Sequence, residues 1–224
     1  MQDNFRVVFL GATGAVGSQA LKQLLSFNNV SRILSLGRRP VEIDTIPTYL
    51  EQVKIDIHQP SSYADQVHDC DIAICTLGVG ESTKVSKEEF IAIDKTAVIN
   101  FAKICKDNGV KHFHLLASVG TNSKSMNYYM RTKGELIDEL TALNFDSLSI
   151  YQPSMILTPT NRYGIVQGIF LVVWPKLDFI FQGSARKYRG IKVDLLGKSM
   201  ANNISNTRRG VEFLTYDDFI RLQK

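Results

Sequence analysis

The chain has 224 residues, of which 44% are hydrophobic and 21% are charged. This length and composition suit one well-buried globular domain and exclude two domains of ordinary size. The formal net charge of +4 is spread along the chain without a basic run, which favours anionic small molecules over nucleic acid as ligands. Three cysteines without C-x-x-C spacing predict neither a disulfide framework nor a zinc site, and they suit a reducing, cytoplasmic setting.

Two features of the sequence bear on targeting. The first residues, MQDNFRVV, carry no signal-peptide pattern. The most hydrophobic window, residues 164–181, contains Gln167, Pro175, Lys176 and Asp178, so its uninterrupted apolar length is below that of a membrane-spanning helix. We therefore expect no transmembrane segment and interpret this window as buried core or as a lid.

An apolar run at residues 7–10 is followed by a glycine-rich turn and a helical pattern. The run has no polar alternation, as expected of a strand covered on both faces. Such a turn at a helix N-terminus lets the backbone approach a diphosphate, although Thr13 stands where the common fingerprint has its second glycine. A merely flexible loop would not explain the flanking strand and helix. The residues expected to bind a dinucleotide here are Gly11, Thr13, Gly14, Ala15, Val16 and Gly17.

The end of the second predicted strand, residues 32–36, indicates the cofactor. An acidic side chain there would accept hydrogen bonds from the ribose hydroxyls of NAD, whereas arginines complement the extra phosphate of NADP. Arg38 and Arg39 occupy this place, and no acid precedes Glu42. NADP(H) is the predicted cofactor and NAD(H) the less favoured one; the alternative is that both arginines are solvated loop charges.

Strands and helices alternate to about residue 153, which predicts an α/β fold with a Rossmann-type doubly wound parallel sheet. Further strands are expected at residues 52–56, 71–77, 110–118 and 147–151, and a long helix at residues 86–108. Ligands of such sheets bind beyond the carboxyl ends of the strands. We therefore expect Asp56, Ile57, Leu77, Gly78 and Val79 near the dinucleotide. For Asp56, a helix cap before residues 61–64 is an equal alternative.

His112 and His114 alternate along the fifth predicted strand and so share one face. A metal pair would need a third ligand, and the sequence offers no evident candidate. Ordinary packing or surface roles are therefore the favoured interpretation.

The pattern changes after residue 155. Residues 158–187 have no clear period, residues 192–204 contain a short helix with Asp194 as a plausible cap, and residues 211–214 and 216–222 suit a last strand and helix. We expect a single domain over residues 1–224, with a cofactor-binding core at 1–155 and a small substrate or lid segment at 156–224. The apolar run at 165–174 suits a lipophilic pocket, an oligomer interface or, preferably, core.

Ser118, Tyr129 and Lys133 form the candidate catalytic set. Tyr129 and Lys133 are four residues apart in a predicted helix, so their side chains share a face. A lysine ammonium beside the phenol favours the phenolate, as general acid–base work near neutral pH requires. Ser118, at the end of a strand, would orient the substrate oxygen. Tyr188 and Lys192 repeat the spacing, but no strand that ends in serine precedes them, so the first pair is favoured.

The order GATGAVG, GRR, CTLG, Ser118, YMRTK and QPS resembles the short-chain dehydrogenase/reductase superfamily, in its atypical branch of NAD(P)-binding proteins. The stretches VKHFHLLAS, KGELIDEL and IKVDLLGKSMANNI resemble the Tat-interacting-protein-like oxidoreductases. This resemblance implies an NADP(H)-dependent oxidoreductase in which Ser118 orients the substrate, Tyr129 gives or accepts the proton and Lys133 binds the nicotinamide ribose. Residues bordering the nicotinamide would be Pro153, Ser154 and Met155. Where many members have an asparagine after the fourth strand, this chain has Asp94, with Asn100 further along, so the resemblance does not carry a proton relay through that helix.

The leading hypothesis is an enzyme that transfers hydride between NADPH and a carbonyl or alcohol substrate. Two other functions share the site: a non-catalytic NADPH sensor acting through a protein partner, and an epimerase of the sugar-nucleotide type. Retention of Ser118, Tyr129 and Lys133 together favours the enzyme, because sensing requires only the glycine turn and the arginines. A homodimer through the long helices is left open.

Overall fold

The computed structural model describes residues 4–80, 84–159, 180–206 and 208–223. Among them, seven parallel strands form one sheet in the order β3-β2-β1-β4-β5-β6-β9. The strands are β1 (Phe5–Leu10), β2 (Val30–Gly37), β3 (Leu50–Lys54), β4 (Ile72–Cys75), β5 (His112–Leu116), β6 (Ser147–Tyr151) and β9 (Gly210–Leu214). The strand order changes direction between β1 and β4, where ligands of such sheets bind. The predicted doubly wound α/β fold is confirmed.

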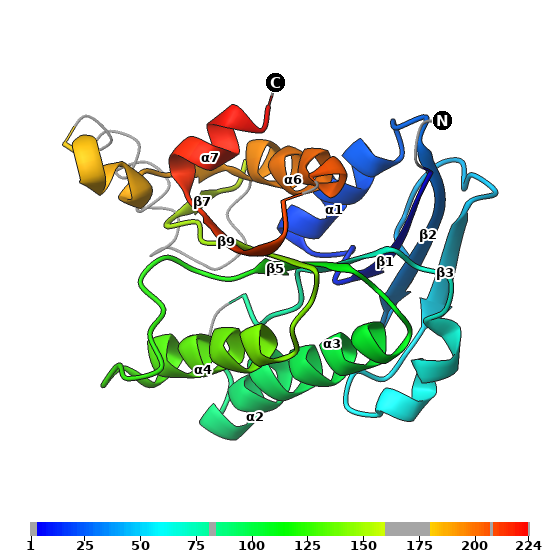
Figure 1. Ribbon diagram of the computed structural model, residues 1–224, viewed down its shortest axis with the longest axis horizontal. Helices are drawn as coiled ribbons and strands as arrows, with labels where there is room; N and C mark the ends of the chain where they lie inside the picture. Colours follow the sequence, from blue (N-terminus) through cyan, green and yellow to red (C-terminus); the bar gives the residue numbers. More distant parts are fainter. Residues whose placement is uncertain (1–3, 81–83, 160–179, 207, 224) are drawn as a thin grey trace.

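Helices cover both faces of the sheet (Figure 1). One face carries α1 (Ala15–Leu24), α6 (Val193–Asn202) and α7 (Tyr216–Arg221), and the other carries α2 (Lys87–Ile91), α3 (Val98–Asp107) and α4 (Tyr128–Ala142). Strand β1 contributes Val7 and Phe9 to the hydrophobic cluster on the α1 side, and Val8 and Leu10 to the cluster on the α3 side. Because both faces are buried, the strand is apolar at every one of these positions.

The helix predicted for residues 86–108 is present but not uniform. Ser86 caps it by accepting the N–H of Glu89 at 3.1 Å, and it ends at Asn108 before Gly109, whose φ is +81°. Between α2 and α3 the chain forms a π-helical turn, η4 (Ala92–Ala97). Turns of this kind are frequent at functional sites.

Short elements complete the described chain. They are the 3₁₀ helices η1 (Pro60–Ser62), η2 (Ala64–Gln66), η5 (Gly183–Tyr188) and η6 (Asn203–Ser205), and a two-stranded parallel sheet of β7 (Ile156–Leu157) and β8 (Ile191–Lys192). The apolar run at residues 165–174 lies outside the described residues. No helix among those that are described is both long and apolar enough to cross a membrane.

The C-terminal residues 191–206 and 208–222 complete the core layers. Strand β9 pairs with β6, and α6 packs so closely on α1 that a Cβ at Gly197 would lie 2.5 Å from the Cβ of Gln19. The predicted division at residue 155 therefore does not separate a core from a lid over this part of the chain. The predicted cap was also wrong: Lys192 is the N-cap of α6, while Asp194 lies in its first turn, where a negative charge favours the helix dipole.

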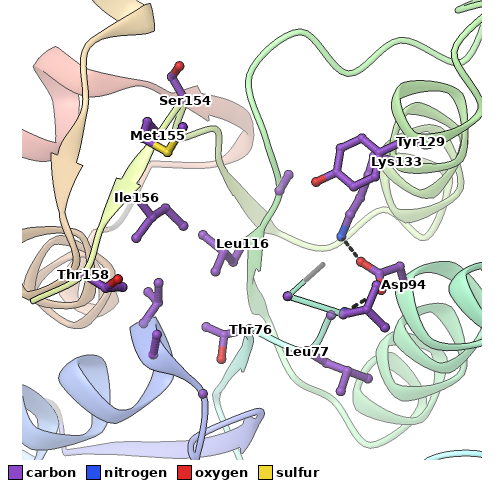
Figure 2. Close-up of a pocket in the computed structure, with 17 residues that line it drawn as sticks. Thr76, Leu77, Asp94, Leu116, Tyr129, Lys133, Ser154, Met155, Ile156 and Thr158 are labelled. Carbon is purple, nitrogen blue, oxygen red and sulfur yellow. Dashed lines mark hydrogen bonds and ion pairs between the residues drawn. The ribbon is translucent and has the colours of Figure 1, made fainter. Parts of the chain in front are cut away.

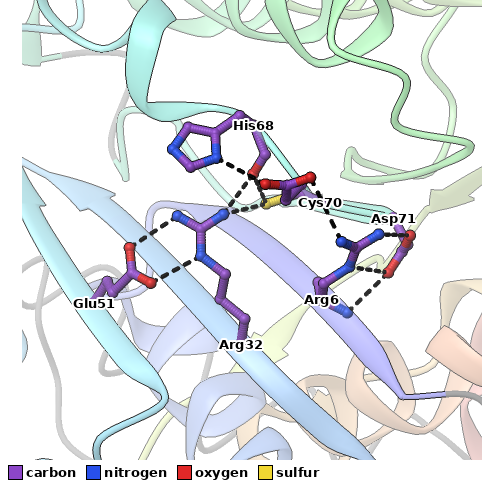
Figure 3. Close-up of polar contacts among 7 residues, drawn as sticks. Arg6, Arg32, Glu51, His68, Cys70 and Asp71 are labelled. Carbon is purple, nitrogen blue, oxygen red and sulfur yellow. Dashed lines mark hydrogen bonds and ion pairs between the residues drawn. The ribbon is translucent and has the colours of Figure 1, made fainter.

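Two arginines form hydrogen bonds with carboxylates at the amino ends of the strands (Figure 3). Arg32 on β2 donates to both carboxylate oxygens of Glu51 on β3, each at 2.8 Å, and also to the carbonyl of His68. Arg6 on β1 donates to Asp71, before β4, through Nε at 3.0 Å and Nη2 at 2.8 Å. These contacts lie at the edge opposite the carboxyl ends and so stabilise the sheet away from the ligand edge.

His112 and His114 share one face of β5, as predicted, and their ring centroids are 3.9 Å apart. His112 Nε2 lies 2.8 Å from Ser149 Oγ, and His114 Nδ1 lies 2.9 Å from the hydroxyl of Tyr151, both on β6. Burial lowers the pKa of His112 to about 4 and lowers that of His114 as well. No cluster of three metal-binding side chains occurs in the described part of the chain. The pair thus packs as neutral rings at pH 7.

Candidate functional site

A cavity of about 490 Å³ opens at the carboxyl ends of β4 and β5, beside the start of α1 (Figure 2). This volume lies in the range of small-molecule sites. The predicted residues that line it are Gly14, Ala15, Val16, Leu77, Gly78, Val79, Tyr129, Lys133, Ser154 and Met155. The lining residues that sequence reasoning did not assign to the site are Thr76, Gly80, Asp94, Leu116, Ala117, Ile156 and Thr158.

The glycine turn is too tight for side chains at two positions. Gly11 has φ +96°, and a Cβ there would lie 2.7 Å from Thr76 Oγ1. A Cβ at Gly17 would clash with the carbonyl oxygen of Gly11. Thr76 donates its hydroxyl to that same carbonyl at 2.9 Å and so fixes the turn to the end of β4. Gly14 is the N-cap of α1, and no side chain caps this helix, which leaves its first turn suited to an anion.

Tyr129 and Lys133 face the cavity from the start of α4. Asn127 caps this helix, since its Oδ1 accepts the N–H of Tyr129 at 2.9 Å and that of Met130 at 3.2 Å. The ring of Tyr129 packs against Phe90 of α2 with centroids 5.3 Å apart. The spacing of four therefore brings the phenol and the ammonium to one cavity, as predicted from the helix period.

Lys133 is held by a carboxylate (Figure 2). Its Nζ lies 2.7 Å from Oδ1 of Asp94, whose Oδ2 accepts the N–H of Val79 at 2.7 Å. Burial by itself would lower the pKa of Lys133, but the Asp94 carboxylate opposes this effect and the pKa is raised. The cavity thus contains a buried, charged lysine between a tyrosine and an aspartate.

Two of the predicted residues near the substrate end lie outside the cavity lining. Ser118 follows β5, is half-buried, and its Oγ lies 3.5 Å from the carbonyl oxygen of Val119. Pro153 accepts the N–H of Val119 at 3.0 Å and so joins the loops after β5 and β6. Gly11, Thr13 and Gly17 likewise shape the turn without lining the cavity.

The residues predicted at the adenine end also lie outside the lining. Arg38 and Arg39 are exposed directly after β2. The exposed Asp56 accepts the N–H of His58 at 2.9 Å, and it is not the cap of the following helix, because Gln59 occupies the N-cap position of η1. Ile57 is buried in the hydrophobic core.

The second Tyr-x-x-x-Lys spacing does not form a matching pair. Tyr188 ends the 3₁₀ helix η5, whereas Lys192 lies in β8, so the two do not share one turn of α-helix. Tyr129 and Lys133, by contrast, lie in one α-helix, α4.

A signal for Thr76 was present in the sequence, since it stands between an apolar strand and Leu77-Gly78-Val79, at the expected ligand edge. Asp94 was marked in the sequence only through the family resemblance, which leads one to expect asparagine at its place. Its contact with Lys133 joins positions far apart in the chain, and neither periodicity nor local spacing encodes such a contact.

The family model described as NAD(P)H-binding matches residues 11–168 of the chain. The chain is 32% identical over 155 residues to Protein HTATIP2 of Rattus norvegicus, an alignment that covers 69% of this chain and 64% of that protein. It is 34% identical over 154 residues to the mitochondrial Protein FMP52 of Meyerozyma guilliermondii, covering 68% and 65%. The chain therefore spans slightly less than two thirds of the length of these relatives.

Solved structures share the fold at low sequence identity. MoeE5 in complex with UDP-glucuronic acid and NAD has a TM-score of 0.71 at 15% identity, covering 93% of this chain and 75% of that one. A short-chain dehydrogenase family protein from Francisella tularensis has a TM-score of 0.67 at 13% identity, covering 94% and 96%. The solved structures thus show the fold, and the family match over residues 11–168 shows that the chain belongs to the NAD(P)H-binding family, with similarity to HTATIP2 and FMP52.

Proposed function

We propose that the chain is an NADP(H)-dependent oxidoreductase that transfers hydride between NADPH and a carbonyl or alcohol substrate. The observation that carries the proposal is that the start of α1, Tyr129 and Lys133 line one cavity. Membership of the NAD(P)H-binding family supports a nicotinamide dinucleotide as the ligand. The preference for NADP rests on Arg38 and Arg39, whose exposed guanidinium groups follow the strand next to the glycine turn.

The residues at the site fit such a cofactor. The turn from Gly11 to Gly17 keeps side chains away from the backbone, as close approach of a diphosphate requires. Lys133 would bond the ribose hydroxyls, and Ser154 and Met155 would border the nicotinamide, with Pro153 directly before them. Bound NADPH supplies the hydride.

Tyr129 performs the proton chemistry in this proposal. In reduction its hydroxyl donates a proton to the carbonyl oxygen of the substrate, and in oxidation the phenolate takes the proton from the alcohol. The ammonium of Lys133 stabilises the phenolate that reduction leaves behind. The apolar side chains of Leu116 and Ile156 line the same cavity and limit water near the reacting atoms.

A second function, an NADPH sensor that acts through a protein partner, is favoured by the position of Ser118. Its hydroxyl lies near a carbonyl of its own loop and outside the cavity lining, so the group expected to orient the substrate is not in place. A sensor needs the dinucleotide turn but not this hydroxyl. No contact among the described residues favours an epimerase.

The test begins with fluorescence titration of the protein with NADPH and NADH, followed by NADPH oxidation against a panel of carbonyl compounds. We expect tighter binding of NADPH, and a 10²–10⁴-fold loss of kcat in Tyr129→Phe. Tyr188→Phe is the matched control, because Tyr188 has a lysine at the same spacing but lies outside the cavity lining. Tight NADPH binding without turnover would transfer support to the sensor, and failure to bind either nucleotide would overturn both functions.

Two further expectations stay predictions. The cytoplasmic location rests on the unpaired cysteines, and the FMP52 relatives are named as mitochondrial proteins. The prediction of a homodimer rests only on the presence of the long helices.

A further inference from the structure

We propose that Asp94 is a positioning residue that keeps the buried side chain of Lys133 charged and anchors it beside Tyr129 at the cavity. The inference rests on the proposed function, because it assigns a task to Asp94 in the acid–base work of that site.

The Asp94 carboxylate holds two parts of the cavity wall together. Oδ1 lies 2.7 Å from Nζ of Lys133 on α4, and Oδ2 accepts the N–H of Val79, in the loop after β4, at 2.7 Å. Gly78 makes room for this arrangement, since a Cβ there would lie 2.9 Å from Oδ1. Asp94 comes from the π-helical turn η4, which accommodates one more residue than an α-helical turn. Both oxygens are therefore used, one on the lysine and one on the backbone.

The depth of the pair explains why a carboxylate is needed. Lys133 is 5% exposed and Asp94 is 2% exposed, and an ammonium so far from water loses its proton readily unless an opposite charge compensates it. The other titratable groups that act on Lys133 are Tyr129 on its own helix and Cys75 on β4. Burial raises the pKa of the Cys75 thiol to about 12, so this thiol is neutral. Among the groups described around Lys133, the compensating carboxylate is that of Asp94.

The consequence for catalysis concerns the alkaline side of the pH profile. A protonated Lys133 stabilises the phenolate of Tyr129, whereas a neutral amine does not. With Asp94 in place, Lys133 keeps its proton across the pH range in which the enzyme works. In Asp94→Asn the compensating carboxylate is gone and burial meets less opposition, so the lysine loses its proton at lower pH and activity declines with it.

The test is an NMR titration of protein labelled with ε-¹³C lysine, without cofactor, from pH 6 to pH 11. The Lys133 signal is assigned by its absence in Lys133→Met. We expect the wild-type midpoint at or above the ordinary lysine value of about 10.4, and a midpoint lower by at least about one pH unit in Asp94→Asn. In kcat/KM profiles the alkaline limb should move to lower pH by a comparable amount.

The matched control is Glu135→Gln. It removes a carboxylate from the more exposed pair of Lys95 and Glu135, which joins the same two elements at 2.8 Å, and it should leave the Lys133 midpoint unchanged. An unchanged midpoint in Asp94→Asn, or an equal shift in Glu135→Gln, would overturn the inference. If Asp94→Asn does not fold, the wild-type titration decides, because a Lys133 midpoint clearly below 10.4 would contradict the inference.

The titration needs no turnover, so it separates this inference from the proposed function. A shifted Lys133 midpoint in a protein that reduces no carbonyl compound would leave the inference standing and the oxidoreductase proposal without support. Turnover that depends on Tyr129, together with an unshifted midpoint, would support the function and overturn the role of Asp94.

Discussion

Lowering the pH from 7 to 5 is expected to destabilise the protein through the closely packed, tilted rings of His112 and His114. Burial lowers the pKa of His112 from 6.5 to about 4, although Glu212 acts in the opposite direction, and the pKa of His114 is also lowered. Below pH 6.5 both histidines take up a proton in the unfolded chain but stay neutral in the folded chain. The stability from each neutral ring is therefore complete above pH 6.5 and is lost as the pH falls toward the folded pKa.

The magnitude follows from the size of the shift. A difference of about 2.5 pH units for His112 corresponds to about 3 kcal/mol in total, of which about 2 kcal/mol is lost by pH 5. His114 adds to this loss in the same direction. Glu51 and Asp71 affect stability at lower pH. Hydrogen bonds from Arg32 and Arg6 hold the pKa of each carboxyl below its usual value, so the stability that these carboxylates contribute is lost only on further acidification.

Urea unfolding at pH 7 and pH 5, without cofactor, measures the effect. The wild type should lose at least about 2 kcal/mol of unfolding free energy between the two pH values, and His112→Gln should lose about 2 kcal/mol less than the wild type. His58→Gln is the matched control, since His58 is exposed, and its loss should equal that of the wild type. A wild-type loss below about 1 kcal/mol, or an equal loss in His112→Gln, would refute the reasoning.

Two further predictions concern close contacts. Thr76→Val removes the hydroxyl that donates to the carbonyl of Gly11 at 2.9 Å, so it should weaken NADPH binding about fivefold in a fluorescence titration. Thr141→Val is the control, because it removes a 2.8 Å hydrogen bond to a carbonyl within α4 and should leave NADPH binding unchanged. Equal affinities of the Thr76→Val variant and the wild type would contradict the role of Thr76. Gly197→Ala places a Cβ 2.5 Å from that of Gln19 and should lower the unfolding free energy, measured by urea titration, by about 1–3 kcal/mol. An unchanged urea midpoint would show that α1 and α6 move apart without a loss of stability.

Much of the sheet could be predicted from the sequence, because its central strands are buried on both faces. Ile72–Cys75 of β4 and Val7 to Leu10 of β1 carry only apolar side chains or cysteine and are bounded by turns, so they are recognisable without tertiary information. The placement of β9 was harder. Val211 and Phe213 are exposed on this edge strand, and a short exposed strand in a C-terminal segment carries no sign of the partner strand that it joins.

The site was predictable to the extent that helix periodicity and strand ends determine it. Tyr129 and Lys133 meet in the cavity because four residues make about one helical turn. Ser118 was expected beside them, but its direction depends on the loop that follows β5, where Gly120 has φ +79°. The π turn that carries Asp94 was not predictable either, since its residues fit an ordinary helix pattern and the partner that its carboxylate meets comes from α4.

The loop after β4 connects the two halves of the cavity. Thr76 at its start donates to the carbonyl of Gly11 in the glycine turn, and Val79, three residues later, donates to Asp94, which in turn contacts Lys133. These three contacts measure 2.9, 2.7 and 2.7 Å, and together they link the glycine turn to the helix that carries Tyr129 and Lys133 through a single short segment. The cavity therefore depends on the sequence CTLGV at residues 75–79 as well as on the glycine turn and the Tyr-x-x-x-Lys spacing. This short segment thus contacts the glycine turn directly and the helix that carries Tyr129 and Lys133 through Asp94.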